Sequence, residues 1–316
     1  MIWFSVRRLA LLIVSLAVAS VVIFLLLHLL PGDAAQVAAG TQASPAQVEQ
    51  ARHDLGLDKS FVHQYASWVG GVVHGDLGSS VLSGVSVSDQ LNKKLGVTVP
   101  LVLGSTTLSI LVAVPLGIFA SIRHRRVDGV ALSALTQLGI ALPTLFVGLM
   151  LIVIFGVHWE LLPTQGFPSS GWRDRSEAAR SLVLPVVTLA IAQAAVLTRF
   201  VRSAMLDVLH QEYIRTARAK GLTRLQAITR HGIRNAALPI VSVLGVQVAG
   251  LLAGVVVIER VFSLPGIGQM LLKDVGNRDI VKVESTLLVI TAIVLLIGFL
   301  VDVALRLIDP RLRSAR

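Results

Sequence analysis

The hydrophobic positions of this 316-residue chain lie in long continuous runs rather than in an alternating pattern. Six runs approach or exceed the roughly 20 residues that a helix needs to cross about 30 Å of hydrocarbon. None of the six contains Asp, Glu, Lys or Arg: they are Leu9–Leu30, Leu95–Ile122, Gly129–Val157, Ser181–Thr198, Asn235–Ile258 and Ser285–Val301. Inside a bilayer such a run satisfies its own backbone groups only as a helix. The pattern therefore predicts an all-α integral membrane fold with six spans.

The first run resembles a secretory signal peptide. Arg7 and Arg8 precede it, and the tripeptide Ala17-Val18-Ala19 resembles a cleavage site. Cleavage there would leave a strongly apolar new N-terminus, and the run is longer than the roughly 7 to 15 residues of a signal-peptide core. We interpret it as a retained membrane helix.

The polar segments between the runs give the expected organisation of the chain. We expect a first helix with its N-terminal tail, an external cap, a five-helix core that includes a polar loop, and a C-terminal tail. These parts cover residues 1–30, 31–94, 95–305 (loop 199–234) and 306–316.

Local signals within the external segments predict three features. In "SPAQVEQARHDLGL", Ser44 is suited to cap a helix and Pro45 to occupy its first turn. Residues 161–180 are rich in Pro, Gly and Ser and predict an irregular loop. In "FSLPGIG", Pro265 and Gly266 predict a tight turn.

The charged residues predict which side of the membrane each segment faces. If the N-terminus is inside, the inner segments hold 17 of the 28 Lys and Arg but only 4 of the 18 Asp and Glu. Positive charge is typical of cytoplasmic loops, so both termini are expected in the cytoplasm. This distribution also accounts for the isoelectric point near 11.0 without a nucleic-acid partner.

No motif in the sequence indicates chemistry of its own. There is no phosphate-binding G-x-x-x-x-G-K-[ST] loop, no G-x-S-x-G and no H-E-x-x-H. The chain has no cysteine, and His53, His63 and His74 lack metal-ligand spacing. We therefore expect no catalytic residue, no metal site and no cofactor on this chain.

An ion-coupled secondary carrier is an alternative, because such carriers keep ionisable residues inside their helices. His28 and Asp302 are the only candidates, and both lie near ends of runs, where interfacial pairing is the simpler interpretation. Three glutamines on different runs are candidates for a polar translocation path, although glutamine in a membrane also bonds to neighbouring helices. They are Gln137, Gln193 and Gln247.

The most basic and most polar stretch, residues 211–239, reads "QEYIRTARAKGLTRLQAITRHGIRNAALP". It predicts a short helix from Arg215 to Lys220, with Ala217 and Ala219 as small contact points, ended by Gly221. An apolar periodicity restarts at Leu222. Such a helix pair suits either the surface of anionic lipid or the docking of a soluble partner that supplies the missing energy source.

The same stretch resembles the cytoplasmic loop of ATP-binding-cassette (ABC) importer permeases of the dipeptide and oligopeptide branch. Further resemblance runs along nearly the whole chain: "LLPGD" from Leu29, "LGLDKSFVHQYASWVGGVVHGDLGSS", "ALPTLFVGLMLIVIF", "VIERVFSLPGIGQML" and "VDVALRLIDPRLR". The resemblance implies a six-span type I importer transmembrane domain with cytoplasmic coupling helices, in a bacterial plasma (inner) membrane.

The resemblance also implies partners and substrate. It implies a B-type permease that pairs with a second homologous permease, two cytoplasmic ATPases or one fused ATPase, and an external solute-binding protein. ATP and magnesium would belong to the ATPase partners, and di- or oligopeptides would be the cargo. Nickel or glutathione import is the alternative within the family, and a secondary carrier or a membrane scaffold lies outside it.

One departure concerns the general importer motif E-A-A-x-x-x-G. With its glycine on Gly221, the first three positions hold Arg215, Thr216 and Ala217, so the glutamate is missing. Glu212, one turn earlier, either replaces it or only favours the helix N-terminus. The resemblance implies that the residues contacting the ATPase are Glu212, Arg215, Thr216, Ala217, Arg218, Ala219, Lys220 and Gly221.

Small residues and a proline indicate a gate or a subunit interface. Pro143 permits a kink in the third run, and Gly250 and Gly254 are spaced for close helix approach in the fifth. Ordinary packing within this chain is the alternative for the two glycines.

Overall fold

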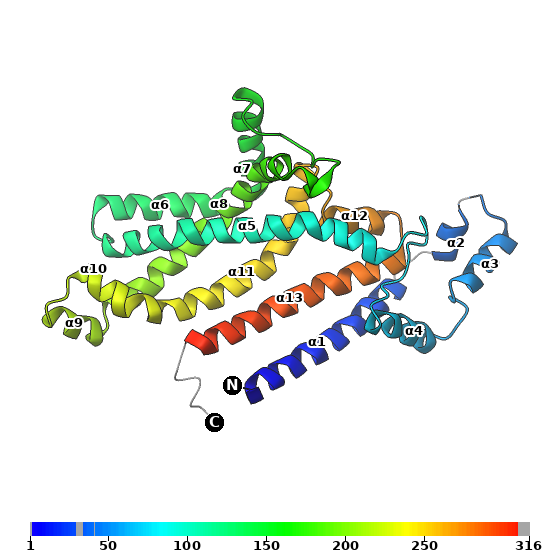
Figure 1. The fold of residues 1–316 in the computed structure, drawn as a ribbon, viewed down its shortest axis with the longest axis horizontal. Helices are drawn as coiled ribbons and strands as arrows, with labels where there is room; N and C mark the ends of the chain where they lie inside the picture. Colours follow the sequence, from blue (N-terminus) through cyan, green and yellow to red (C-terminus); the bar gives the residue numbers. More distant parts are fainter. Residues whose placement is uncertain (1, 30–33, 41, 309–316) are drawn as a thin grey trace. The chain divides into compact units, whose positions relative to one another are not determined.

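The computed structural model describes residues 2–29, 34–40 and 42–308, and the regular elements in these ranges are helices (Figure 1). Five of them are long and apolar enough to cross a membrane, and a bent pair makes six if it counts as one span. The all-α prediction is confirmed. Part of the "LLPGD" motif and the tail from residue 309 onward lie outside the described residues.

The described chain forms two compact units. We call residues 2–98 with 265–296 the amino-terminal unit, and residues 99–264 with 297–308 the central unit. Two long helices, α5 (Val87–Ile122) and α13 (Ile280–Ile308), each contribute to both units.

The amino-terminal unit joins the first span to short helices. It contains α1 (Ile2–Leu29), α2 (Ala34–Ala39), α3 (Pro45–Asp54), α4 (Phe61–Val73) and α12 (Ile267–Gly276), with the starts of α5 and α13. Ser44 and Gln47 form the reciprocal capping box of α3, with Pro45 in its first turn, which confirms the predicted helix start. A small buried cluster of Val87, Leu91, Ile267 and Met270 joins α5 to α12.

The central unit is a helical bundle around α8 (Arg175–Leu209), whose apolar stretch is two-thirds buried. Its other elements are α6 (Val127–Ala141), α7 (Thr144–Leu151), the π-helix η1 (Ile152–His158), the 3-10 turn η2 (Gly171–Arg173), α9 (Glu212–Ala219), α10 (Arg224–Ala227), the π-helix η3 (Ile228–Gly232) and α11 (Ile233–Val261). Small residues permit the close packing: a Cβ on Gly117 would lie 2.6 Å from Val201 of α8.

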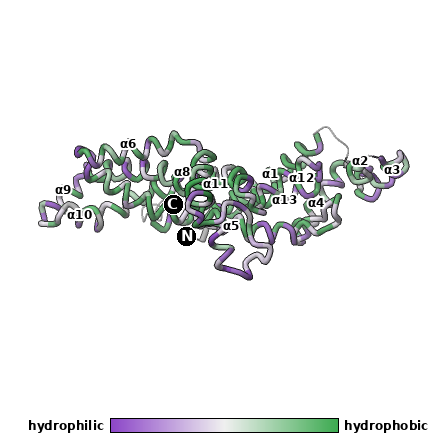
Figure 2. The backbone as a smooth tube through the Cα atoms, turned by 90° about the horizontal axis from the view of Figure 1, so that it is seen from above, coloured by the Kyte–Doolittle hydropathy of each residue, from purple (hydrophilic) through white to green (hydrophobic). Residues whose placement is uncertain are grey.

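Two helices extend far beyond the hydrocarbon thickness. With 36 and 35 residues, α5 and α8 are each about 53 Å long at 1.5 Å per residue. Pro100, Pro115 and Pro185 lie inside these helices, as membrane helices tolerate. Both helices therefore have turns beyond the hydrocarbon core, and α8 leads directly into the polar α9–α10 segment (Figure 2).

The third apolar run does not form one straight helix. It forms α6 and α7–η1, which meet at an angle of 98°. Leu142, the residue before Pro143, is extended (φ −76°, ψ 127°), because proline disfavours a helical conformation in the residue before it. The kink predicted at Pro143 is thus confirmed, and its size makes the run a broken span.

Two loop predictions need correction. The chain reverses at Phe262 and Ser263 rather than at Pro265-Gly266: Ser263 has φ +51°, and the Leu264 N–H donates to the Glu259 carbonyl at 2.7 Å. Gly266 is extended and precedes α12. The segment 161–180 was expected to be irregular throughout, but α8 already begins at Arg175. The Asp174 side chain caps this helix by accepting hydrogen bonds from the Ser176 and Glu177 N–H groups.

Candidate functional site

The polar segment between α8 and α11 has the predicted helix, glycine turn and second helix, but its first helix begins at Glu212 rather than at Arg215. Helix α9 spans Glu212–Ala219, Lys220 follows it, and Gly221 takes φ +91°, a conformation that side chains disfavour. The Leu222 N–H donates to the Ala217 carbonyl at 3.3 Å, which closes the helix end. The segment is therefore a helix, a glycine turn and a second helix.

Helix α9 has one buried face and one exposed face. Ile214 is 2% exposed and Ala217 is 8% exposed. Ala217 therefore faces the bundle, and its predicted role as a small contact point for a partner stays a prediction. The other seven predicted contact residues are exposed: Glu212, Arg215, Thr216, Arg218, Ala219, Lys220 and Gly221.

The buried face of α9 belongs to the core of the central unit. Ile214 and Ala217 lie in one cluster with Val208 of α8 and Ile228 of η3, and Ile122 at the end of α5 packs against it. A Cβ on Gly232 would lie 3.1 Å from Val208, so the second half of the segment also approaches α8 closely. Helix α9 thus shares one buried cluster with α5, α8 and α11.

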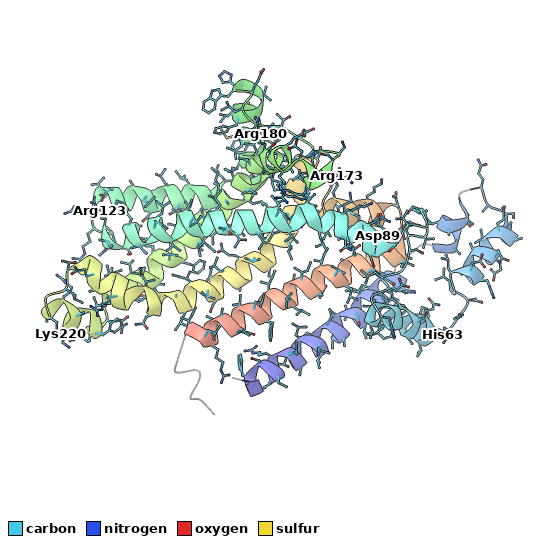
Figure 3. The ribbon with its side chains drawn as sticks, viewed as in Figure 1. His63, Asp89, Arg123, Arg173, Arg180 and Lys220 are labelled. Atoms are coloured by element: carbon cyan, nitrogen blue, oxygen red, sulfur yellow. The ribbon has the colours of Figure 1, made fainter. Side chains whose placement is uncertain are left out.

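The exposed face of α9 is mainly cationic. Arg215 donates to the Glu212 carboxylate at 2.9 Å, which leaves Arg218 and Lys220 as further cations on this face. The α5–α6 turn, where Arg123 pairs with Asp128, lies at the same end of the central unit (Figure 3). This surface offers N–H donors to acidic side chains or backbone carbonyls of a partner.

The three glutamines proposed for a translocation path do not all meet. Gln247 of α11 donates to the backbone carbonyl of Gln193 of α8 at 3.4 Å. Gln193 is 8% exposed, and neither atom of its carboxamide has a hydrogen-bond partner among the described residues. Gln137 is exposed on α6. The structure therefore brings together Gln193 and Gln247, inside the bundle.

The two glycines proposed for an interface have open surroundings. A Cβ built on Gly250 or Gly254 meets no described atom within 4 Å, whereas one on Gly245 would lie 2.8 Å from Val301. Packing within this chain, the alternative for these glycines, is thus not found among the described residues. Pro143 lies at the 98° bend between α6 and α7.

Sequence reasoning missed the buried ionic pairs of the amino-terminal unit. It placed residues up to 284 in a loop, but α13 begins at Ile280 and buries Lys282 and Glu284. Lys282 donates to Asp274 at 2.9 Å, and Asp279 accepts from Ser80 at 2.5 Å. Burial raises the pKa of the Asp274 carboxyl, although Lys282 opposes this shift. The described residues contain no cluster of three metal-ligating side chains.

His28 is likewise paired within the amino-terminal unit. Its Nδ1 lies 2.9 Å from the Phe24 carbonyl and 3.3 Å from the Glu284 carboxylate, and its Nε2 lies 3.3 Å from Gln64 Oε1. These partners come from α1, α4 and α13, which are distant in sequence. The sequence near His28 shows only the apolar run that precedes it, which does not indicate the partners of His28 on α4 and α13.

Comparison with known proteins gives two family matches. Residues 113–314 match the family "Binding-protein-dependent transport system inner membrane component". Residues 1–102 match the family "Binding-prot-dependent transport system membrane comp, N-term". Together the two matches cover nearly the whole chain.

Individual relatives are similar over their full length. The probable peptide ABC transporter permease protein y4tP of Sinorhizobium fredii is 36% identical over 98% of this chain and 99% of its own. The dipeptide transport system permease protein DppB of Escherichia coli K12 is 34% identical over 100% of both chains. The glutathione transport system permease protein GsiC of the same strain is 36% identical over 99% of both.

A solved structure supports the fold. An inward-facing form of the MetNI methionine ABC transporter matches 69% of this chain and 96% of its own, with a TM-score of 0.57 and 17% identity. At that identity the likeness concerns the fold alone. With the family matches and the relatives, the chain belongs to the inner membrane components of binding-protein-dependent transport systems, the permeases of ABC importers.

Proposed function

We propose that this permease imports di- or oligopeptides, with ATP hydrolysed on separate cytoplasmic subunits. The observation that carries the coupling part is α9, a helix with an exposed cationic face whose buried face, Ile214 and Ala217, belongs to the core of the central unit. The peptide substrate is supported by the relatives named as peptide and dipeptide permeases.

The proposed mechanism assigns a mechanical role to this chain. ATP and magnesium bind to the ATPase partners, which are two polypeptides or one fused chain, and their closure moves α9. Because α9 shares a buried cluster with α5, α8 and α11, that motion is proposed to turn the spans and open the path. This chain then needs no nucleotide site of its own, in keeping with the absence of a P-loop motif.

The proposal includes further partners and an orientation. A second, homologous permease completes the path, and an external solute-binding protein delivers cargo. Six spans place both termini on one side, and the Lys and Arg distribution favours the cytoplasm. The chain has no cysteine, so a Gln226→Cys protein labels at one site only. Labelling by an impermeant thiol reagent from outside intact cells would contradict this orientation.

Glutathione is a second candidate substrate, because a glutathione permease is as similar to this chain as the peptide permeases are. Glutathione is a tripeptide with a γ-glutamyl bond, so an ordinary peptide of the same length is a sharp competitor. The competition is measured as binding or uptake of labelled glutathione and of labelled dipeptide. If unlabelled glutathione displaces the labelled glutathione and no labelled dipeptide is displaced, the glutathione assignment is favoured.

The experiment that tests the function is uptake by proteoliposomes that contain the full complex. Labelled dipeptide should accumulate only with ATP, the solute-binding protein and the ATPase subunits present. Accumulation driven by an ion gradient without ATP would indicate a secondary carrier. Failure of every peptide under conditions in which another cargo accumulates would overturn the peptide assignment.

A further inference from the structure

The amino-terminal unit contains a cavity of about 790 Å³, within the range of small-molecule pockets. Its walls come from the end of α1, the turn after α3, one side of α4, residues 76–81 and the start of α13. All of these segments belong to the same compact unit. The cavity is separate from α9 and from the Gln193–Gln247 pair, which lie in the central unit.

A buried carboxylate lies in the wall of this cavity. Glu284 is 4% exposed, and its Oε1 has no hydrogen-bond partner among the described residues. The nearest cationic candidate is His28, whose Nδ1 is 3.3 Å from that oxygen. The Nδ1 proton is directed to the Phe24 carbonyl at 2.9 Å, because a carbonyl can only accept. Glu284 Oε1 thus lies at ion-pair distance from His28 but accepts no well-aligned hydrogen bond from a described residue.

The second ring nitrogen of His28 is also engaged. Gln64 donates its Nε2 to the Lys59 carbonyl at 2.8 Å, so its Oε1 is the atom that faces His28 Nε2 at 3.3 Å. With both ring nitrogens donating, His28 is a cation that offsets part of the Glu284 charge, although its N–H groups are directed at other acceptors. A buried carboxylate whose one neighbouring cation directs its N–H groups elsewhere keeps unfilled acceptor sites, and a donor supplied by a ligand would fill them.

The rest of the wall combines negative charge with aromatic rings. The lining includes four carboxylates, two Lys or Arg side chains and three histidines, of which His28 is paired with Glu284. Phe24, Phe61 and Trp68 add aromatic surface, and the rings of Phe24 and Trp68 stack with centroids 6.3 Å apart. Aromatic faces together with a carboxylate are suited to an ammonium group on an apolar body.

Arg52 and Lys59, also in the lining, are suited to a carboxylate at the other end of a ligand. We propose that this cavity binds a small zwitterion with a protonated primary amine, held by Glu284, on an apolar body that packs on Phe24 and Trp68. Short peptides have this chemistry, and their identification as the ligand rests on the proposed function. The site is an additional binding site on the permease itself.

Trp68 makes the binding measurable. In the full chain in lipid nanodiscs, with the other three tryptophans (Trp3, Trp159 and Trp172) replaced by phenylalanine, Trp68 is the only indole. The probes are the dipeptide Ala-Phe and its N-acetylated form, which differ in the ammonium group. We expect saturable change of Trp68 emission with Ala-Phe and binding at least about tenfold weaker with the acetylated peptide, the effect of one charge-assisted hydrogen bond.

Variants locate the recognition. Glu284→Gln keeps the side-chain volume and should weaken Ala-Phe binding about tenfold or more while removing the preference over the acetylated peptide. Glu177→Gln, on an exposed carboxylate at the start of α8 in the central unit, should change neither. Circular dichroism and gel filtration check that each variant is folded. If Glu284→Gln does not fold, the site is tested by comparing the binding of Ala-Phe and its N-acetylated form to the protein that keeps Glu284.

Equal binding of both peptides, or no saturable signal, would overturn the site. Phenethylamine that binds while Ala-Phe does not would overturn the zwitterion assignment. The assay contains no ATPase and measures no transport, so it is distinct from the test of function. Peptide uptake without Trp68 binding counts against the site alone, and Trp68 binding without peptide uptake counts against the proposed function alone.

Discussion

Gln247 of α11 donates its side-chain Nε2 to the backbone carbonyl of Gln193 of α8 at 3.4 Å. The Gln193 carboxamide is buried beside this bond, and neither of its polar atoms has a partner among the described residues. The Gln247 Oε1 also has none. The packed helices α8 and α11 thus hold three buried polar atoms without a hydrogen-bond partner among the described residues. A shift of α11 along α8, or a cargo molecule in the path, would give these atoms partners.

The buried amide predicts a stability effect. Gln193→Met keeps the length of the side chain and removes two unsatisfied polar atoms, whose burial costs about 1–3 kcal/mol. We expect a higher thermal unfolding midpoint in detergent, measured by tryptophan fluorescence. If Gln193 also serves the translocation path, uptake falls although the protein is more stable. Gln137→Met, on an exposed position of α6, is the control and should alter the midpoint little. A lower midpoint for Gln193→Met would show that its amide has a partner.

The two alanines of α9 should respond differently to the same change. Ala217 is packed in the core, so Ala217→Leu overpacks it at a cost of about 1–3 kcal/mol and should lower the unfolding midpoint. Ala219 is exposed, so Ala219→Leu should leave the midpoint unchanged and reduce uptake per ATP hydrolysed by obstructing docking. Thermal unfolding and coupled transport in proteoliposomes measure the two effects. An unchanged midpoint for Ala217→Leu would contradict the inward orientation of this residue.

Local signals in the sequence predicted the segment that carries the proposed function. The end of α9 at Gly221 and the capping of α3 at Ser44 depend on a few neighbouring residues, so they could be predicted without knowledge of the fold. The face of α9 could not be assigned as safely. Ile214 lies three residues before Ala217 and so shares its side of the helix, and this apolar spacing was the available signal that Ala217 points inward.

Contacts between distant segments were beyond the sequence argument. Ser80 and Asp279 are 199 residues apart, and His28 of α1 and Glu284 of α13 meet only in the folded chain. The 98° bend at Pro143 is another case, because proline predicts a break but the angle depends on what α7 packs against. The start of α13 was predicted too late, because the charged residues Lys282 and Glu284 indicate an exposed loop when considered alone. In the structure both are buried in the first turns of the helix.

The Lys282–Asp274 pair predicts a pH-dependent defect. Lys282→Met leaves a buried carboxylate without its cation, which costs about 3–5 kcal/mol at neutral pH. Burial raises the pKa of Asp274 in the folded protein, and loss of Lys282 raises it further. The protonated carboxyl is then favoured by folding, so the stability is present at low pH and is lost as pH rises through the raised pKa. Unfolding midpoints across acidic to neutral pH should show the defect shrinking as pH falls.

A second substitution separates charge from packing at this pair. Lys282→Met combined with Asp274→Leu removes both charges and should recover much of the lost stability at neutral pH. The double variant should also lose the pH dependence of the single one. A double variant as unstable as Lys282→Met alone would assign the defect to packing.

The open glycines of α11 predict a subunit contact. A Cβ at Gly250 or Gly254 meets no described atom within 4 Å, so we expect Leu at both positions to leave the unfolding midpoint of the isolated chain unchanged. If the second permease packs here, the same double substitution should prevent co-purification of the pair. Gly245→Leu is the contrast, because its side chain would collide with Val301 and should destabilise the isolated chain. Intact co-purification of the Gly250 and Gly254 variant would contradict the interface.

The last prediction concerns Gly221, which ends α9. Its φ of +91° is unfavourable for a side chain, by about 1–2 kcal/mol, although the space around it is open. Gly221→Val adds a β-branched side chain, so the turn should relax toward negative φ and shift α9 on the bundle. Asparagine tolerates positive φ better than other side chains. Gly221→Asn therefore adds a side chain of similar bulk with less strain, and serves as the matched control.

The two variants separate coupling from membrane or lipid association. In proteoliposomes containing the full complex, Gly221→Val should hydrolyse ATP with little peptide uptake, whereas Gly221→Asn should retain most of its uptake per ATP. Because α9 is the element assigned to contact the ATPase, Gly221→Val should lower the ratio of peptide uptake to ATP hydrolysis. Membrane insertion of the chain should stay unchanged. If the segment only lies on anionic lipid, both variants should transport normally, and removal of any basic residue should matter equally. Full uptake by the Gly221→Val protein would therefore refute the coupling role of α9.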